Sequence, residues 1–361
     1  MTSLPATPLR ILFVPNWRVA RDPQATAIQR PNLALPRQPY WFFRHFVRPT
    51  RVTVLDIGNP ACASVQDRLL SFYPVQALRA AMDARQFDVV VVHGAPSAVG
   101  LLPLLRTFVR LAPPCVVIDP GCLNMGRAER RVQFALTRHA LGLSQHIVWH
   151  SSASKRFCEV FAPELAAKGS FVPFGIALDD IPPVAPRDGD YAVCLRYSDT
   201  TWPTIARAWE QLKDIPLYLL SKQRGESAEP ATRLDEMPFT DYCRFVTRAR
   251  VALLPLDDGW GSWGQTTLLH AMALRTPVVA SDVKPIRDYA QRCCALVEPA
   301  SPGAWVREVR ALWSNADYRE KLAADGLEAV ASRFSEQRLG QELESVVAAV
   351  LERHDRGTGW H

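Results

Sequence analysis

The most informative part of this sequence is residues 260–281, WGSWGQTTLLHAMALRTPVVAS. A loop with glycines at 261 and 264 leads into a short apolar helix, and a buried strand, TPVVAS, follows. The first amides of a helix have no partner inside the helix, so they can face an anion. The stretch therefore predicts a strand-loop-helix-strand unit with a diphosphate site at the start of the helix.

The same alternation of strand and helix extends over the whole chain. Continuous apolar runs separated by segments with helical spacing of apolar residues are typical of a parallel sheet covered on both faces. The strands predicted in this way are residues 9–15, 52–57, 87–93, 115–119, 146–150, 170–173, 191–195, 217–220, 251–256, 277–281 and 294–297. The predicted helices are residues 75–85, 100–111, 128–141, 202–212, 239–248, 302–313, 318–333 and 335–354.

A break in this alternation predicts two domains. Residues 179–190 combine three prolines with charged residues and read as a linker. We expect a Rossmann-like domain at residues 1–180, a second at residues 181–334, and a C-terminal helix with a tail at residues 335–361. A chain of 361 residues also exceeds the usual size of a single hydrophobic core.

Composition excludes several classes. Hydrophobic residues make up 48% and charged residues 22%, as in ordinary globular proteins. There is no apolar run of the roughly 20 residues that span a bilayer, and the N-terminus has no signal-peptide pattern, so we expect a cytoplasmic protein. The eight cysteines lack metal-ligand spacing, and Cys115 is expected to be a buried apolar side chain.

Positive charge is concentrated in the first half. Residues 1–180 contain 20 Lys and Arg against 11 Asp and Glu, whereas the remainder contains 22 against 25. This asymmetry predicts an anionic partner for the first half, either a phosphate-bearing acceptor or the surface of an anionic membrane. The basic helical segment that begins at Gly126 and includes Arg138 and His139 is either a solvated surface or part of that contact.

Residues 260–282, within a second domain of the right length, resemble the donor-binding segment of retaining glycosyltransferases of family 4, the glycosyl transferases group 1. The resemblance implies the α/β GT-B fold, in which two Rossmann-like doubly wound domains face each other. It also implies that the last helix crosses back to the first domain. No G-x-G-x-x-G motif is present, which argues against a dinucleotide dehydrogenase.

Ligands of doubly wound sheets bind at the carboxyl ends of the strands. His93 and Gly94 end the valine-rich strand, and His93 resembles the histidine that the family places against the donor sugar. Asn16 and Trp17 follow the first strand and are candidate acceptor-side residues together with Gly94. The aromatic run at residues 40–46 is expected to be core, with an acceptor-stacking platform as the alternative.

The resemblance also assigns residues in the second half. Arg196 follows a strand at the position of the family's arginine, which holds the charge of the departing diphosphate. The family usually has a lysine six residues later, where this chain has Trp202. Lys222, at the carboxyl end of another strand, is the candidate substitute, and a solvated loop lysine is the alternative.

The donor loop departs from the family at two positions. Two glutamates eight positions apart are replaced by Ser262 and His270, and His270 retains the ability to hydrogen-bond a ribose hydroxyl. Main-chain amides and threonine hydroxyls would bind the phosphates. The predicted donor-binding residues are Lys222, Ser262, Gly264, Gln265, Thr266, Thr267 and His270, and the predicted catalytic residues are His93 and Arg196.

The implied function is a metal-independent hexosyltransferase of glycoconjugate or polysaccharide biosynthesis that needs no cofactor. It would move a sugar, with retention, from a UDP- or GDP-linked donor to a glycan, a lipid-linked acceptor or a small molecule. Asp188-Gly189-Asp190 has the spacing of a metal-binding motif but lies in the linker. Two alternatives remain: a sugar-nucleotide 2-epimerase of the same architecture, and a degenerate, non-catalytic binding protein.

Overall fold

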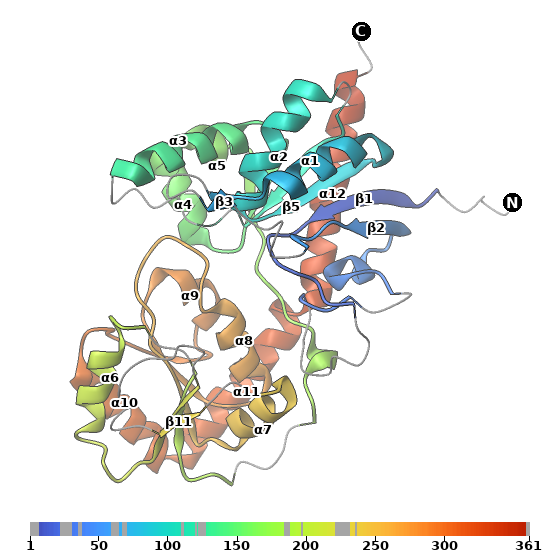
Figure 1. Cartoon of the computed structure of the whole chain (residues 1–361). Helices are drawn as coiled ribbons and strands as arrows, with labels where there is room; N and C mark the ends of the chain where they lie inside the picture. The colour runs from blue at the N-terminus through green and yellow to red at the C-terminus, as the bar shows by residue number, and fades with distance from the viewer. Residues whose placement is uncertain are drawn as a thin grey trace, which may run out of the picture. The chain divides into compact units, whose positions relative to one another are not determined.

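The computed structural model describes residues 7–21, 31–34, 38–58, 65–66, 71–109, 112–119, 121, 128–183, 188–195, 198–220, 232–234 and 237–358. The chain divides into two compact units, each with its own parallel sheet (Figure 1). Of the described residues, those up to Pro173 and from Leu339 onward form the first unit, and Phe174–Arg338 form the second.

The first unit is built on a six-stranded parallel sheet of order β2-β1-β5-β6-β7-β8. The central strands are buried along almost their entire length, because helices cover both faces. The strands are β1 (Leu9–Val14), β2 (Thr50–Val54), β5 (Val89–His93), β6 (Cys115–Ile118), β7 (His146–Trp149) and β8 (Gly169–Phe171). A small antiparallel pair, β3 (Val65–Gln66) and β4 (Ser71–Phe72), lies apart from this sheet.

Five helices connect these strands and one closes the unit. The connecting helices are α1 (Pro74–Asp83), α2 (Ala95–Phe108), α3 (Ala128–Gly142), α4 (Ser152–Phe161) and α5 (Pro163–Ala166). The closing helix, α12 (Glu336–Thr358), is fixed by Glu344, whose carboxylate accepts hydrogen bonds from the backbone N–H of Val47 (2.8 Å) and of Arg48 (2.7 Å). Gly340 lets α12 approach closely, since a Cβ there would lie 2.6 Å from the carbonyl oxygen of Phe42.

The second unit repeats the architecture with the strand order β11-β10-β9-β12-β13-β14. All neighbouring strands in this sheet are parallel. Its strands are β9 (Ala192–Cys194), β10 (Leu217–Leu220), β11 (Thr232–Leu234), β12 (Val251–Leu254), β13 (Val278–Ser281) and β14 (Ala295–Val297). Its helices are α6 (Trp202–Trp209), α7 (Phe239–Arg248), α8 (Gln265–Ala273), α9 (Lys284–Ala290), α10 (Pro302–Ser314) and α11 (Ala316–Arg333).

The predicted fold class is confirmed, since both units are doubly wound α/β structures. Each predicted strand overlaps an observed one, although β2 and β8 begin before the predicted residues 52–57 and 170–173. The aromatic run at residues 40–46 forms a short 3-10 helix, η1 (Trp41–His45), and packs into the core, with Trp41, Phe42 and Phe43 almost fully buried. Cys115 is likewise buried, as predicted. The sequence did not predict β3, β4, β11, α4, α5 or α9.

Candidate functional site

Each sheet contains one topological switch point, where consecutive connections leave in opposite directions. In the first unit it lies between β1 and β5, and in the second between β9 and β12. At a switch point the loops after two neighbouring strands separate and leave a crevice at the carboxyl edge, where doubly wound proteins bind ligands. The predicted site residues that the structure describes follow these strands.

In the first unit, the structure brings Asn16, Trp17, His93 and Gly94 together. The rings of Trp17 and His93 meet edge to face with their centroids 4.7 Å apart. The side chain of Asn16 lies over Gly94, because a Cβ at position 94 would lie 2.3 Å from Asn16 Nδ2. Gly94 has a φ of +85° and precedes the first residue of α2, so glycine is required here both for space and for backbone conformation.

His93 is a neutral hydrogen-bonding group in this cluster. Its Nδ1 is buried and has no hydrogen-bond partner among the described residues. Burial lowers the pKa of His93 well below the ordinary value of 6.5, and the charge of nearby His150, with ring centroids 6.1 Å apart, lowers it further. A neutral imidazole can donate one hydrogen bond and accept another, which suits a sugar hydroxyl.

Gln76 holds the loops around this cluster in place. Its Nε2 donates to the carbonyl oxygens of Pro15 (2.7 Å) and Leu55 (2.9 Å), just after β1 and β2. Its Oε1 accepts from Ser97 Oγ (2.8 Å) in the first turn of α2. Sequence reasoning missed Gln76, and the only available signal was a glutamine on the apolar side of a predicted helix, among Ala77, Ala80 and Ala81.

In the second unit, Gly264 starts α8 in the left-handed conformation, with a φ of +85°. A Cβ at this position would lie 2.5 Å from Leu256 Cδ1, so the chain turns closely over the loop after β12. The first intrahelical bond runs from Leu268 N–H to Gly264 O (2.9 Å). Among the residues that the structure describes, no side chain caps α8. The first backbone N–H groups of α8 have no partner inside the helix, so they are available to an anion.

The side chains around the start of α8 differ in whether they are free to contact a ligand. Thr266 is exposed and Thr267 is half-buried, so their hydroxyls can reach a ligand. Gln265 is buried, and its Nε2 donates to the carbonyl oxygen of Pro285 (2.8 Å), so it connects α8 to α9. Ser262 Oγ is buried without a partner among the described residues.

His270 lies one turn further along α8 and is buried, with 7% of its surface exposed. Its ring packs edge to face on Phe239, with centroids 5.4 Å apart. Burial lowers the pKa of His270 to about 4, although the negative charge of Asp180 acts in the opposite direction and raises it. The ring is therefore neutral at pH 7.

Hydrogen bonds join the two loops of this switch point. The carboxylate of Asp257, after β12, accepts from Ser198 Oγ (2.8 Å) and Thr200 Oγ1 (2.6 Å), both after β9. The backbone carbonyl of Asp257 accepts from Trp263 Nε1 (3.1 Å), which fixes the loop that leads to Gly264. Sequence reasoning did not identify Asp257, Ser198 or Thr200 as positioning residues.

A second carboxylate in the same loop holds the start of α9. Asp258 accepts from the backbone N–H of Lys284 (3.0 Å) and pairs with its ammonium group. Although burial alone would raise it, these hydrogen bonds lower the pKa of Asp258 below its ordinary value. The Lys284 ammonium also lies over the ring of Trp260, 5.0 Å from its centroid.

The predicted cations at this site are not covered by the structure. Arg196 and Lys222 both lie outside the described residues. Trp202, at the position of the family's lysine, is the first residue of α6 and packs partly buried against the core. The acidic pair in the linker is engaged in ion pairs, Asp188 with Arg248 and Asp190 with Arg250, each at 2.7 Å.

No group of His, Cys, Asp and Glu side chains suited to a metal ion occurs among the residues that the structure describes. In the same residues, no helix combines the length and the hydrophobicity needed to cross a bilayer.

A comparison with known protein families gives a match to part of the chain. Residues 200–315 match the family described as "Glycosyl transferases group 1". The chain contains a glycosyl transferases group 1 domain. The matched segment includes the loop after β12, the start of α8 and the following strand. No curated protein matches the sequence significantly.

Solved structures confirm the GT-B fold of the whole chain. Sucrose-phosphate synthase from Thermosynechococcus elongatus has a TM-score of 0.70 at 13% identity, covering 96% of this chain and 100% of that one. Anabaena HepE in complex with UDP has a TM-score of 0.65 at 11% identity, covering 94% and 100%. The α,α-trehalose-phosphate synthase (UDP-forming) from Burkholderia vietnamiensis has a TM-score of 0.67 at 13% identity, covering 96% and 99%.

Proposed function

We propose that the protein is a retaining, metal-independent glycosyltransferase that uses a UDP- or GDP-linked hexose as donor. The start of α8 carries the proposal: Gly264 turns in the left-handed conformation, no side chain caps the helix, and the threonine hydroxyls of Thr266 and Thr267 stand beside its first amides. Backbone amides at a helix start are suited to a diphosphate. The family match over residues 200–315 supports the same assignment.

The proposed chemistry needs no protein nucleophile. The departing diphosphate accepts the proton of the acceptor hydroxyl, while Arg196, assisted by Lys222, and the amides near Gly264 hold the charge that develops on it. His93 donates a hydrogen bond to the sugar through its neutral ring. Ser262 and His270 line the donor side, and His270 takes the place of a carboxylate on the ribose.

The first unit is the proposed acceptor side, with Asn16, Trp17 and Gly94 at its switch point. An aromatic edge and an amide beside a neutral histidine suit an uncharged hydroxyl-bearing acceptor, such as a glycan or the sugar of a lipid-linked acceptor. For the donor, UDP is the first nucleotide to test, because HepE was solved with UDP and the trehalose-phosphate synthase is UDP-forming.

The decisive experiment combines a donor screen with an arginine substitution. Thermal shift against a panel of UDP- and GDP-sugars identifies the donor, because a ligand that binds only the folded state raises its stability. With that donor, Arg196→Ala should reduce turnover about 100-fold or more, since a group that stabilises the developing charge contributes roughly that much. Arg207→Ala, an exposed arginine of α6 in the same unit, is the matched control and should retain full turnover.

Three results would contradict the proposal. If no nucleotide sugar binds, the protein is a degenerate binding protein. If the donor alone yields an epimer without any acceptor, the activity is that of a 2-epimerase. If Arg196→Ala and Arg207→Ala retain equal turnover, Arg196 does not hold the leaving group.

A further inference from the structure

Helix α1 presents its large apolar side chains to solvent. Its buried side is formed by small residues, Ala77, Ala80 and Ala81, together with Gln76. Its outer side carries Val75, Leu78 and Met82, which are 39%, 56% and 73% exposed. Residues spaced by three, four and seven positions lie on one side of a helix, so these three form a continuous stripe. The small residues form the buried side of α1, whereas the outer stripe leaves much of its apolar surface in solvent.

The neighbouring helices carry further exposed apolar side chains. α1 packs against α2, and α2 packs against α3. Phe108, the last residue of α2, is 73% exposed, and Val132 and Leu136 on α3 are 50% and 39% exposed. α1 and α2 both lead into strands of the same parallel sheet, so Met82 and Phe108 lie at the same end of adjacent helices. We call these six side chains, Val75, Leu78, Met82, Phe108, Val132 and Leu136, the apolar face.

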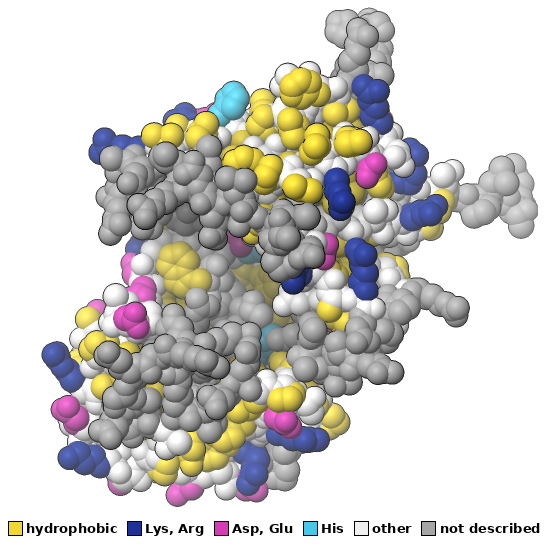
Figure 2. Space-filling model, in the orientation of Figure 1, with side chains coloured by type: hydrophobic (Ala, Val, Ile, Leu, Met, Phe, Trp, Pro, Cys, Tyr) yellow, Lys and Arg dark blue, Asp and Glu magenta, His cyan; other side chains and the backbone are white. Residues whose placement is uncertain are grey.

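The space-filling view shows hydrophobic side chains gathered over the region of α1 and α2, with Lys and Arg side chains around them (Figure 2). The second unit has no comparable surface: among its described residues, Leu296 is the one exposed large hydrophobic side chain, at 38%. Large contiguous exposed apolar patches are rare on monomeric proteins and mark interaction sites.

Exposed arginines lie on the same helices as the apolar face. Arg79 on α1, Arg106 on α2 and Arg131 on α3 are exposed, and Arg85 follows the end of α1. Asp83 is the exposed acid at that end of α1. The surrounding half of the sequence has 20 Lys and Arg against 11 Asp and Glu. An apolar centre with a basic border is the composition of protein surfaces that lie in the interface of an anionic bilayer.

We propose that the apolar face docks the first unit onto an anionic lipid bilayer. Leu78, Met82 and Phe108 enter the boundary between headgroups and acyl chains, and the arginines pair with lipid phosphates. A second copy of the chain would fit less well, because pairing this face with itself would bring arginines of both copies together. The proposal does not depend on the proposed transferase activity.

Vesicle sedimentation tests the proposal with the full-length protein. The protein should sediment with vesicles of phosphatidylcholine containing about one third phosphatidylglycerol, and much less with phosphatidylcholine alone, because the arginines respond to the negative surface. The double variant M82S/F108S, which removes apolar contact without changing charge, should reduce the bound fraction at least about fivefold. R79E/R106E should reduce binding to the anionic vesicles and leave the weak binding to neutral vesicles unchanged.

Leu296→Ser in the second unit is the matched control and should bind vesicles like the unchanged protein. Circular dichroism of each variant establishes that it folds, so a loss of binding is not a loss of structure. Equal binding of M82S/F108S and the unchanged protein to anionic vesicles would overturn the proposal. So would size-exclusion chromatography in which M82S/F108S converts a dimer to a monomer without changing vesicle binding, since the face would then belong to a second copy.

Discussion

At the scale of single residues, the candidate site depends on neutral histidines and on glycines that no other residue can replace. His93 and His270 each stand at a switch point, and burial lowers the pKa of both. Gly94 and Gly264 each precede a helix with a φ of +85°. Each unit thus has a glycine with positive φ directly before a helix start, but the two turns differ, because ψ is 147° at Gly94 and −18° at Gly264.

The burial of His270 has a consequence for stability at acidic pH. Its pKa is about 4 in the folded protein against an ordinary value of 6.5, so the unfolded chain takes up a proton first as the pH falls. The contribution of His270 to the unfolding free energy is therefore fully present above about pH 6.5 and is lost as the pH falls from 6.5 to about 4. From pH 7 to pH 5 this residue should account for about 2 kcal/mol of lost unfolding free energy.

His270→Gln isolates this effect, since glutamine cannot titrate. In urea unfolding, the loss of stability between pH 7 and pH 5 should be about 2 kcal/mol smaller in His270→Gln than in the unchanged protein. His139→Gln replaces an exposed histidine of α3 and serves as the control. The same pH dependence in all three proteins would show that His270 is not buried as the structure has it.

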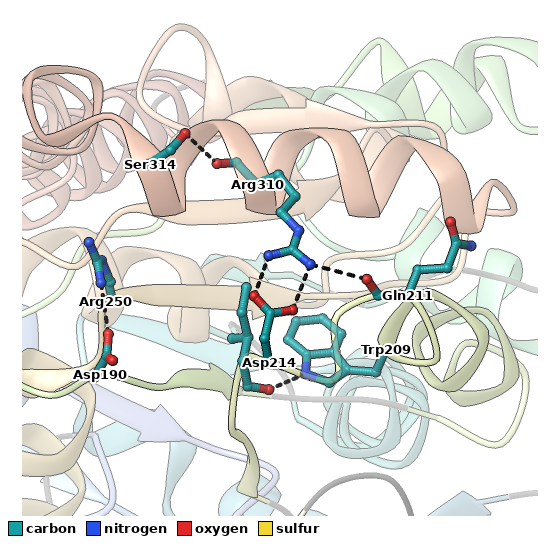
Figure 3. Close-up of polar contacts among 8 residues, drawn as sticks. Asp190, Trp209, Gln211, Asp214, Arg250, Arg310 and Ser314 are labelled. Atoms are coloured by element: carbon teal, nitrogen blue, oxygen red, sulfur yellow. Dashed lines mark hydrogen bonds and ion pairs between the residues drawn. The ribbon is translucent and has the colours of Figure 1, made fainter.

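At the scale of helices and strands, polar contacts fix the outer layer of the second unit (Figure 3). Arg310 on α10 holds the carboxylate of Asp214 with both terminal nitrogens and also donates to the carbonyl oxygen of Gln211 (3.2 Å). Trp209 Nε1 donates to the carbonyl oxygen of Ile215 (3.0 Å) in the same loop. These bonds tie α10 to the connection between α6 and β10.

The Arg310–Asp214 pair should nevertheless contribute little to stability. Both side chains are substantially exposed, 44% and 59%, and water screens exposed pairs even when the geometry is bidentate. A double-mutant cycle with Arg310→Ala and Asp214→Ala should give a small coupling energy that falls with added salt. A large coupling energy that does not change with salt would mean that the pair is shielded from water.

The elements also show what the sequence could and could not predict. Buried parallel strands are apolar throughout, so runs such as residues 87–93 and 251–256 were recognisable one by one. β11 reads Thr-Arg-Leu and has no such run, and it forms a strand because β10 offers it a free edge. Contacts between loops distant in sequence, such as Asp257 with Ser198 and Thr200, arise from the strand order, which no local pattern contains.

At the scale of the whole molecule, the two units are expected to divide the reaction between them. Among the residues that the structure describes, the predicted donor-binding residues follow β12 of the second unit. The predicted acceptor-side residues follow β1 and β5 of the first unit. The matched segment, residues 200–315, lies entirely within the second unit. Nucleotide binding should therefore depend on the second unit alone, whereas sugar transfer should depend on both.

A pair of substitutions, one in each unit, tests this division. In the proposed function His93 contacts only the reacting sugar, so His93→Ala should leave the Kd for UDP or GDP unchanged by calorimetry while reducing turnover about 100-fold. Thr267→Val removes one hydroxyl from the proposed phosphate site and should weaken nucleotide binding roughly 10- to 100-fold, since one hydrogen bond to a charged group contributes about that much. If His93→Ala weakens the binding of the free nucleotide as strongly as Thr267→Val does, nucleotide recognition is not confined to the second unit.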